Sequence, residues 1–205
     1  MTTLVYIGAN CGNSLWDLID KFDEVYAFEP DPEMFEQLNR RYRQFEWVTL
    51  VNAACSLEEG ESDLYVTPNR VSSSLSNVNI EKYGGEPASK VIKVKSINLL
   101  KYLKDNNIEY IDSYYSDCQG SDLNILKTIK EYIDLKKISE FFIETHNNKT
   151  EIYYGLDNQF DGFKEILSKN YKFIHASLGS QNNKIVKEED IPQNEMEWDS
   201  YWKLK

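Results

Sequence analysis

The sequence predicts an α/β protein with a mostly parallel sheet and helices on both faces, because short apolar runs alternate with amphipathic stretches along the chain. Residues 4–7 form a β-rich run that ends in Gly8, and residues 25–28 form a second run before Asp31 and Pro32. A capping acid followed by proline is typical of a helix start. The alternation continues to residue 186 and predicts a Rossmann-like sheet of the seven-stranded type.

The remaining elements follow from the same patterns. Further strands are expected at 48–51, 63–66, 91–94, 111–115, 141–143, 171–175 and 184–186, one of them antiparallel near the C-terminus. Helical spacing predicts helices over 15–22, 32–42, 96–103, 121–133 and 160–167, with caps at Ser14, Asp31, Ser96 and Ser121. The aromatic residues Trp198, Tyr201 and Trp202 are three to four residues apart, which predicts a short helix packed on the body.

Composition and charge exclude several classes of protein. The chain has 205 residues with 34 acidic and 23 basic side chains, a net charge of −11 at pH 7. This field repels polyanions, so nucleic acid and anionic membranes are poor partners. We find no apolar run of the roughly 18–20 residues that span a bilayer and no export signal. Three widely spaced cysteines, Cys11, Cys55 and Cys118, favour a reducing, cytoplasmic setting over a disulfide framework or zinc site.

The length predicts one domain over residues 1–205. Within it, residues 67–89 form a long connection without periodicity that contains Pro68, a serine run at 72–74, Gly84-Gly85 and Pro87. Long connections of this kind are usually functional, so we expect a lid or substrate loop there.

The loop after the first strand and the acid after the second predict a nucleoside site. Ligands of wound parallel sheets bind beyond the carboxyl ends of the strands. Gly8 and Gly12 allow tight turns there, and Glu29 lies 21 residues after Gly8, a spacing at which an acid accepts hydrogen bonds from ribose hydroxyls. The G-x-x-x-G spacing and the lack of a basic side chain in the loop favour an adenosine ligand without phosphates.

Six motifs in order then carry a resemblance to a known family. They are residues 7–14 (IGANCGNS), 27–32 (AFEPDP), 52–54 (NAA), 73–75 (SSL), 117–126 (DCQGSDLNIL) and 142–144 (FIE). Their order and spacing over residues 4–175 resemble those of the FkbM family of S-adenosylmethionine-dependent O-methyltransferases. This resemblance implies a class I methyltransferase fold with S-adenosylmethionine as the cofactor and S-adenosylhomocysteine as the product.

The resemblance also implies which residues hold the cofactor. Gly8, Asn10 and Gly12 would line its methionine and ribose part, Glu29 would hold the ribose diol, and Ala53 and Ala54 would lie near the adenine. The complete expected cofactor set is Gly8, Ala9, Asn10, Gly12, Ser14, Glu29, Pro30, Ala53, Ala54, Ser73, Ser74 and Asp117.

Three positions depart from the family pattern. Tyr6, Gln119 and Asp122 stand where the family usually has Asp, Glu and Glu. Gln119 cannot act as a base, so hydrogen bonding is its expected role. The chain begins close to its first strand, where relatives carry leading helical structure. This suggests a module of a longer protein, such as the multidomain glycan-synthesis proteins of large DNA viruses, in which it would be fused to glycosyltransferase domains.

Methyl transfer to a hydroxyl needs a group that accepts the proton. Asp117 is the favoured base, with His146 and Glu144 as further catalytic candidates, and a role for Asp117 in helix capping is the alternative. Gln119, Tyr115, Tyr153 and Tyr154 are the expected substrate-binding residues, because aromatic planes suit the C–H faces of sugars. No compact metal-ligand spacing is present, so no metal is expected, although a divalent cation held by Asp117, Asp122, Glu144 and His146 stays an alternative.

The sequence thus predicts an S-adenosylmethionine-dependent O-methyltransferase. Its expected acceptor is a carbohydrate hydroxyl on a glycan or glycoside, with a deoxyhexose such as rhamnose as one example. Two other classes stay open: a NAD-linked oxidoreductase of the same topology, and a non-catalytic module that binds a partner. The expected location is the cytoplasm of the cell or of an infected host cell.

Overall fold

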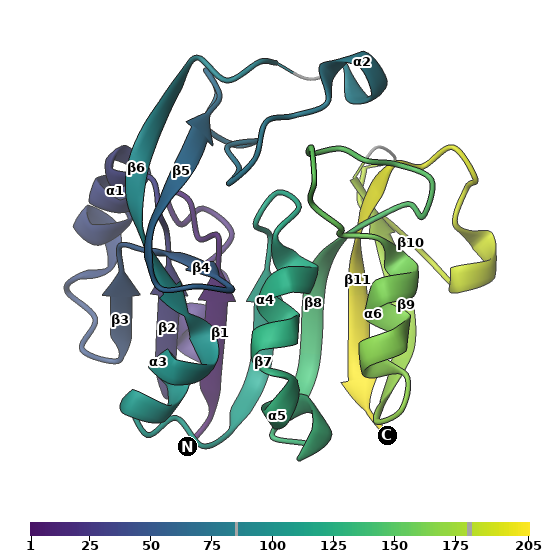
Figure 1. Cartoon of the computed structure of the whole chain (residues 1–205). Helices are drawn as coiled ribbons and strands as arrows, with labels where there is room; N and C mark the ends of the chain where they lie inside the picture. Colours follow the sequence, from purple (N-terminus) through teal and green to yellow (C-terminus); the bar gives the residue numbers. More distant parts are fainter. Residues whose placement is uncertain (85, 180–181) are drawn as a thin grey trace.

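The computed structural model describes residues 1–84, 86–179 and 182–205, and Gly85 of the predicted loop lies outside the described residues (Figure 1). The strands are β1 (Thr3–Ile7), β2 (Glu24–Phe28), β3 (Val48–Val51), β4 (Ala54–Ser56), β5 (Gly60–Val66), β6 (Lys90–Asn98), β7 (Ile111–Ser116), β8 (Ile138–His146), β9 (Tyr171–Leu178), β10 (Lys184–Val186) and β11 (Glu197–Leu204). The helices are α1 (Pro32–Tyr42), α2 (Ile80–Tyr83), α3 (Leu99–Asp105), α4 (Asp122–Thr128), α5 (Lys130–Asp134) and α6 (Phe160–Leu167), with 3₁₀ turns η1 (Ile19–Lys21) and η3 (Glu188–Asp190).

The large sheet confirms the predicted fold class. Its order is β10-β9-β11-β8-β7-β1-β2-β3, and the five strands from β8 to β3 are parallel. Strand β11, which was not predicted, runs antiparallel between β8 and β9, and the predicted strand at 184–186 is β10, which pairs antiparallel with the edge of β9. The described sheet therefore has eight strands rather than the seven predicted. The strand order reverses between β1 and β7, and sheets of this kind bind ligands at such a switch point.

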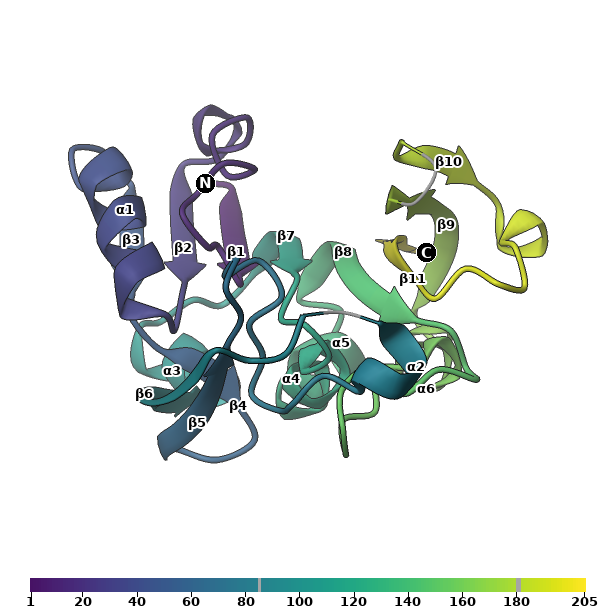
Figure 2. The same cartoon turned by 90° about the horizontal axis from the view of Figure 1, so that it is seen from above.

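Two apolar cores cover the two faces of the sheet, since successive side chains of a strand point to opposite faces. Val5 and Ile7 of β1 belong to the core under α3, α4, α5 and α6. Leu4 of β1 packs instead with Leu38 and Tyr42 of α1. Figure 2 shows α1 and η1 on one side of the sheet and α3 to α6 on the other.

Strands β7 and β8 carry helices on one face. On the opposite face of these two strands there is no helix among the described residues 1–84, 86–179 and 182–205. Figure 2 shows this open side between η1 and β10. Tyr115, Phe142 and Tyr201 lie there and are only partly buried. Their rings stack across β7, β8 and β11, with centroids 4.4 Å apart for each neighbouring pair.

A second, three-stranded sheet rises above the carboxyl edge of the large one. It has the order β4-β6-β5, and Figure 1 shows β5 and β6 projecting upward beside β1 and β2. The predicted loop 67–89 joins these two strands and contains α2. Antiparallel bridges join this loop to β5 (Tyr65 with Ser74) and to the segment after β8 (Val78 with Tyr153). The loop therefore connects the small sheet with the far end of the carboxyl edge.

Three predicted elements were wrong. Residues 15–22 form turns and η1 rather than an α-helix capped by Ser14, because only a short segment connects the loop at 8–14 with β2. The apolar pattern still identified Leu15 and Ile19 as buried. Asn98 rather than Ser96 caps α3, accepting a hydrogen bond from the Lys101 backbone N–H, and Ser96 lies within β6.

The third correction concerns the terminal aromatic residues. Residues 197–204 form the strand β11 and not a helix, because pairing with β8 and β9 satisfies the backbone on both edges. Trp198, Ser200 and Trp202 alternate onto the buried face. A spacing of four fits both a helix turn and two steps along a strand, so the pattern did not distinguish them.

The predicted helix over 121–133 divides into α4 and α5 at Ile129. Ser121 holds the cap position of α4, but its side chain makes no capping hydrogen bond. The Leu123 N–H donates instead to the Asn158 side chain at 2.9 Å. Among the described helices none has the length and apolar character to cross a membrane.

The packing of β11 predicts a large stability contribution from Trp202. This residue is 1% exposed and contacts Phe160 and Phe173 with ring centroids 5.9 and 5.2 Å away. Trp202→Ala should lower the free energy of unfolding by about 3–5 kcal/mol, measured by urea denaturation. Trp16→Ala, at a tryptophan that is 57% exposed, should cost less than half as much. Equal losses for the two variants would contradict the central position of β11.

Candidate functional site

The loop after β1 is folded onto the carboxyl end of β2. The N–H groups of Gly8 and Ala9 both donate to the Phe28 carbonyl, at 3.0 and 2.9 Å. The Asn10 N–H donates to Glu29 Oε2 at 2.7 Å, and the Cys11 N–H donates to the Asn10 side chain at 2.7 Å. The N–H groups of residues 8–11 are thus all used within the protein.

Gly8 allows the carboxyl ends of β1 and β7 to meet. It has φ +79°, and a Cβ at this position would overlap the carbonyl oxygen of Asp117. The Asp117 N–H in turn donates to the Ile7 carbonyl at 3.1 Å. A side chain is therefore excluded between the two strand ends at the switch point of the sheet.

A pocket of about 230 Å³ lies over this junction. It contains most of the residues predicted to bind the cofactor, namely Gly8, Ala9, Asn10, Ser14, Glu29, Pro30, Ala53, Ala54, Ser73, Ser74 and Asp117. Its lining combines the apolar side chains of Phe28, Cys55, Leu64 and Leu75 with the carboxyl groups of Glu29 and Asp117. The structure thus brings together eleven of the twelve predicted cofactor residues.

Gly12 is the exception among these residues. It does not line the pocket, because it packs against α1: the Tyr42 hydroxyl donates to the Gly12 carbonyl at 2.5 Å, and a Cβ on Gly12 would meet the Tyr42 ring. Its φ of +83° and this close approach explain the glycine. Gly12 therefore shapes the loop from behind rather than contacting a ligand.

Glu29 is a buried carboxylate in the pocket wall, 5% exposed. Its Oε2 accepts from the Asn10 N–H and its Oε1 accepts from the Asp31 N–H, each at 2.7 Å. Burial nevertheless raises the pKa of Glu29 to about 7, and the nearby Asp31 and Asp117 carboxylates raise it further against those two hydrogen bonds. The side chain is fixed by backbone donors at the end of β2.

Asp117, Gln119 and Glu144 form one hydrogen-bonded set beside the pocket. Gln119 Nε2 donates to Asp117 Oδ1 at 2.6 Å and to Glu144 Oε1 at 3.0 Å. The Tyr153 hydroxyl donates to Gln119 Oε1 at 2.6 Å. This explains the departure at position 119, since a glutamate there would put a third carboxylate among two others. Asp122 lies beneath them and accepts from the Cys118 N–H at 3.0 Å and from Ser116.

Asp117 is the one predicted catalytic residue on the pocket surface. Its side chain faces the pocket and is exposed, while the enclosing walls remove part of its hydration and raise its pKa. It caps no helix, since its carboxylate accepts from Gln119. Glu144 and His146, at 6% and 1% exposed, lie under residues 119–120 and do not line the pocket.

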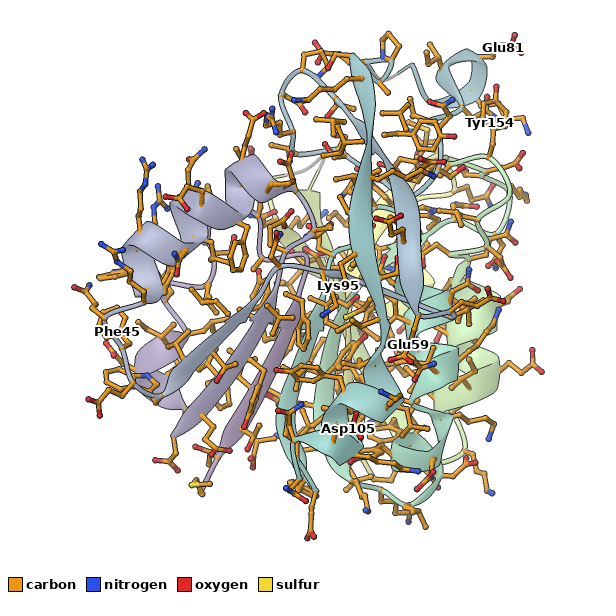
Figure 3. All side chains as sticks on the ribbon, turned by 60° about the vertical axis from the view of Figure 1, so that its left-hand side comes forward. Phe45, Glu59, Glu81, Lys95, Asp105 and Tyr154 are labelled. Atoms are coloured by element: carbon orange, nitrogen blue, oxygen red, sulfur yellow. The ribbon has the colours of Figure 1, made fainter. Side chains whose placement is uncertain are left out.

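Two predicted substrate-binding tyrosines lie away from the pocket. Tyr153 is buried, with its ring against Gly120 and its centroid 6.1 Å from that of His146. Tyr154 is 48% exposed, and Figure 3 shows it at the outer tip of the molecule near Glu81 of α2. Neither lines the pocket, because the bridge between Val78 and Tyr153 turns this segment toward the loop 67–89.

Tyr115 lies in a second pocket that adjoins the first. This groove is on the open side of the sheet and holds Tyr6, Ser14, Tyr115, Ser116, Asp117, Phe142, His175, Ser177, Ile185 and Asp199. Tyr6, Tyr115 and Phe142 in this lining belong to an aromatic row that continues to Tyr201, and the ring centroids of Tyr6 and Tyr115 are 5.4 Å apart. The two pockets share the residues Tyr6, Ser14 and Asp117.

Sequence reasoning missed Arg70 and Asp199. Arg70 lines the first pocket from the loop 67–89, and its guanidinium pairs with Asp31 and Glu33, each at 2.5 Å. Asp199 lies on β11 in the second pocket, where burial raises its pKa to about 6. Neither residue lies in a motif, and both reach the site only through long-range contacts, so no local signal identified them.

Comparison with known families gives a match that fits this geometry. A model described as the methyltransferase FkbM domain matches residues 7–175. The chain belongs to the FkbM methyltransferase family. S-adenosylmethionine is therefore the methyl donor, and the prediction of the family is confirmed. No curated protein matches the sequence.

Solved structures of similar fold include an rRNA methylase from Streptococcus thermophilus, with a TM-score of 0.52 and 12% identity, covering 99% of this chain and 86% of the other. SMU.1697c from Streptococcus mutans, in complex with S-adenosylhomocysteine, has a TM-score of 0.51 and 10% sequence identity. The match covers 100% of this chain and 89% of the SMU.1697c chain. TrmK from M. capricolum, bound to the same product, has a TM-score of 0.51 and 14% sequence identity. The match covers 100% of this chain and 62% of the TrmK chain. The FkbM chain thus spans less than two thirds of TrmK. At such low sequence identity, these similarities show only that the fold is shared.

The residues present fit S-adenosylmethionine better than a dinucleotide. Along residues 8–23, all described, no α-helix follows the loop, and the N–H groups of residues 8–11 already have acceptors. A pyrophosphate needs such donors free at a helix start. Together with the family match, this makes the NAD-linked alternative wrong, and the apolar residues in the pocket lining suit a nucleoside without phosphates.

The junction at Gly8 predicts a specific defect. Gly8→Ala should place a methyl group against the Asp117 backbone and weaken binding of S-adenosylhomocysteine at least about tenfold by calorimetry, a change of about 1.4 kcal/mol. Gly155→Ala is the matched control, because Gly155 has a similar φ of +70° with nothing within 4 Å of its Cβ position. The control should lose about 1–2 kcal/mol of folding free energy, because alanine is strained in the left-handed conformation. Its binding of S-adenosylhomocysteine should be unchanged. Equal binding losses would contradict this role for Gly8.

Proposed function

We propose that this FkbM methyltransferase transfers the methyl group to the oxygen of a carbohydrate hydroxyl. The observation that carries the proposal is the pair of adjoining pockets with Asp117 on the wall that they share. One pocket has the character of a nucleoside site, and the other has an aromatic floor and a polar rim. The two reactants would meet at Asp117.

The first pocket would hold the cofactor as follows. Glu29 would accept hydrogen bonds from the ribose diol, and Ala53, Ala54 and the apolar wall would contact the adenine. The backbone at Gly8 and Asn10 would contact the methionine part of the cofactor. When bound, S-adenosylmethionine supplies an electrophilic methyl group and leaves as S-adenosylhomocysteine. Ser73 and Ser74 would contact it from the loop 67–89, which we regard as a lid or substrate loop.

The second pocket would hold the acceptor. Aromatic planes bind the C–H faces of a sugar ring, and Tyr115 and Phe142 present a stacked surface at its floor. Asp199, Ser177 and His175 at the rim would bind the hydroxyl groups. The carboxylates here and the net charge of −11 disfavour a polyanionic acceptor such as RNA, although an rRNA methylase is among the structural neighbours.

Asp117 would accept the proton of the attacking hydroxyl. The Gln119 amide donates to one of its oxygens at 2.6 Å, and among the described residues nothing donates a hydrogen bond to the other. Because the surroundings raise its pKa, Asp117 is a stronger base than an aspartate of ordinary pKa. Glu144 and His146 would act only through Gln119 and the packing beneath it. Fusion to glycosyltransferase domains and a cytoplasmic location stay predictions of the sequence.

The acceptor class is tested with S-adenosylmethionine labelled in its methyl group. Incubation with rhamnose-terminated oligosaccharides, RNA and a peptide mixture should place the label on a sugar oxygen, identified by linkage analysis. Asp117→Asn should lower turnover at least about 100-fold while S-adenosylhomocysteine binds within about threefold of the wild type. Asp105→Asn, on the exposed side of α3, is the control with unchanged turnover. Label in RNA or peptide alone would overturn the carbohydrate proposal.

Cofactor binding should depend on pH through Glu29. Its raised pKa of about 7 means that the free protein gains a proton on this group between pH 8 and 6. The ribose diol binds best to the ionised carboxylate, so affinity for S-adenosylhomocysteine should fall about tenfold over this range, measured by calorimetry. Asp31 and Asp117 face Glu29, and Arg70 pairs with Asp31. Glu29→Gln should bind more weakly and without this pH dependence.

A further inference from the structure

A buried cluster of ligand-type side chains lies at the ends of β8 and β11. Glu144 and His146 are two residues apart on β8, and His146 pairs with Glu197 of β11. Alternate residues of a strand share a face, so the three side chains point to the same side. One ligand atom from each lies within 4.8 Å of the other two.

The imidazole of His146 points to a missing ligand. The side chain is 1% exposed, and within the described part of the chain its Nε2 atom has no hydrogen-bond partner. Glu144 Oε2 lies 3.9 Å from this nitrogen, too far for a hydrogen bond. A buried polar atom without a partner is costly, and in this position it faces a carboxylate.

The surroundings of His146 are acidic. Across residues 1–84, 86–179 and 182–205, no lysine or arginine forms an ion pair with Glu144, Asp117 or Asp199. A divalent cation at this position would be attracted by the neighbouring carboxylates.

We propose that Glu144, His146 and Glu197 bind a divalent first-row transition-metal cation. Imidazole together with carboxylate is a donor set suited to such cations, with metal–ligand distances of about 2.0–2.2 Å. Two ligands of one ion are then at most about 4.4 Å apart, so ligand atoms that all lie within 4.8 Å of one another need only small side-chain movements to bind it. Water would fill the remaining positions.

The site is separate from the two pockets but linked to Asp117. Glu144 accepts from the Gln119 amide, and the same amide donates to Asp117. The cation would fix Glu144 and thus the orientation of Gln119, so it would position Asp117 without contacting the reactants. This consequence for turnover rests on the proposed function, whereas binding of the cation does not.

Metal binding is tested on tag-free protein stripped with EDTA, without donor or acceptor. Calorimetric titration with Mn²⁺ and, separately, with Zn²⁺ should show one equivalent bound for at least one of them. Glu197→Gln should weaken this binding at least about tenfold. Glu140→Gln, which removes a carboxylate from the same face of β8, should leave it within about twofold.

Circular dichroism of each metal-free variant checks folding, and His146→Gln replaces Glu197→Gln if the latter does not fold. The proposal is overturned if neither cation binds the wild type, or if the ligand variant binds as tightly as Glu140→Gln. Such a result leaves methyl transfer to carbohydrate untouched, since that reaction is assayed separately.

Discussion

The close approach of β1 and β7 at Gly8 is the constraint on which the rest of the site depends. Because Gly8 has no side chain, the backbone of Asp117 lies directly against the first turn. Gly8 and Asp117 both line the first pocket, so this contact forms part of its wall. Glu29 reaches the same pocket because Gly8 and Ala9 bind the Phe28 carbonyl at the end of β2.

From this junction the site extends in two directions. Toward β2 and the small sheet, the first pocket is lined by apolar residues that include Phe28, Leu64 and Leu75. Toward β8 and β11, the open face of the sheet carries the aromatic row and then acids. The same face thus provides a stacking surface beside Asp117 and, farther along β8, the cluster of Glu144, His146 and Glu197. Strand alternation alone places these groups in line.

The three departures from the family pattern have physical explanations in the structure. Tyr6 stacks on Tyr115 and extends the aromatic row over β1. Gln119 joins two carboxylates through one amide, a bridge that glutamate cannot make. Asp122 is fully buried and held by Ser116, Asn158 and the Cys118 N–H, so it supports the turn after β7 rather than contacting a reactant.

The sequence by itself determined the α/β class, the parallel strands, the helices α1 and α6, and most of the predicted residues that line the first pocket. These features depend on local patterns: apolar runs, a capping Asp31 before Pro32, and glycines directly after a strand. Tertiary structure alone decided that residues 197–204 form a strand, that Gly12 supports the loop from behind, and that Arg70 and Asp199 reach the site. Each of these depends on partners far away in the chain, and a spacing of three or four residues does not reveal which partners are present.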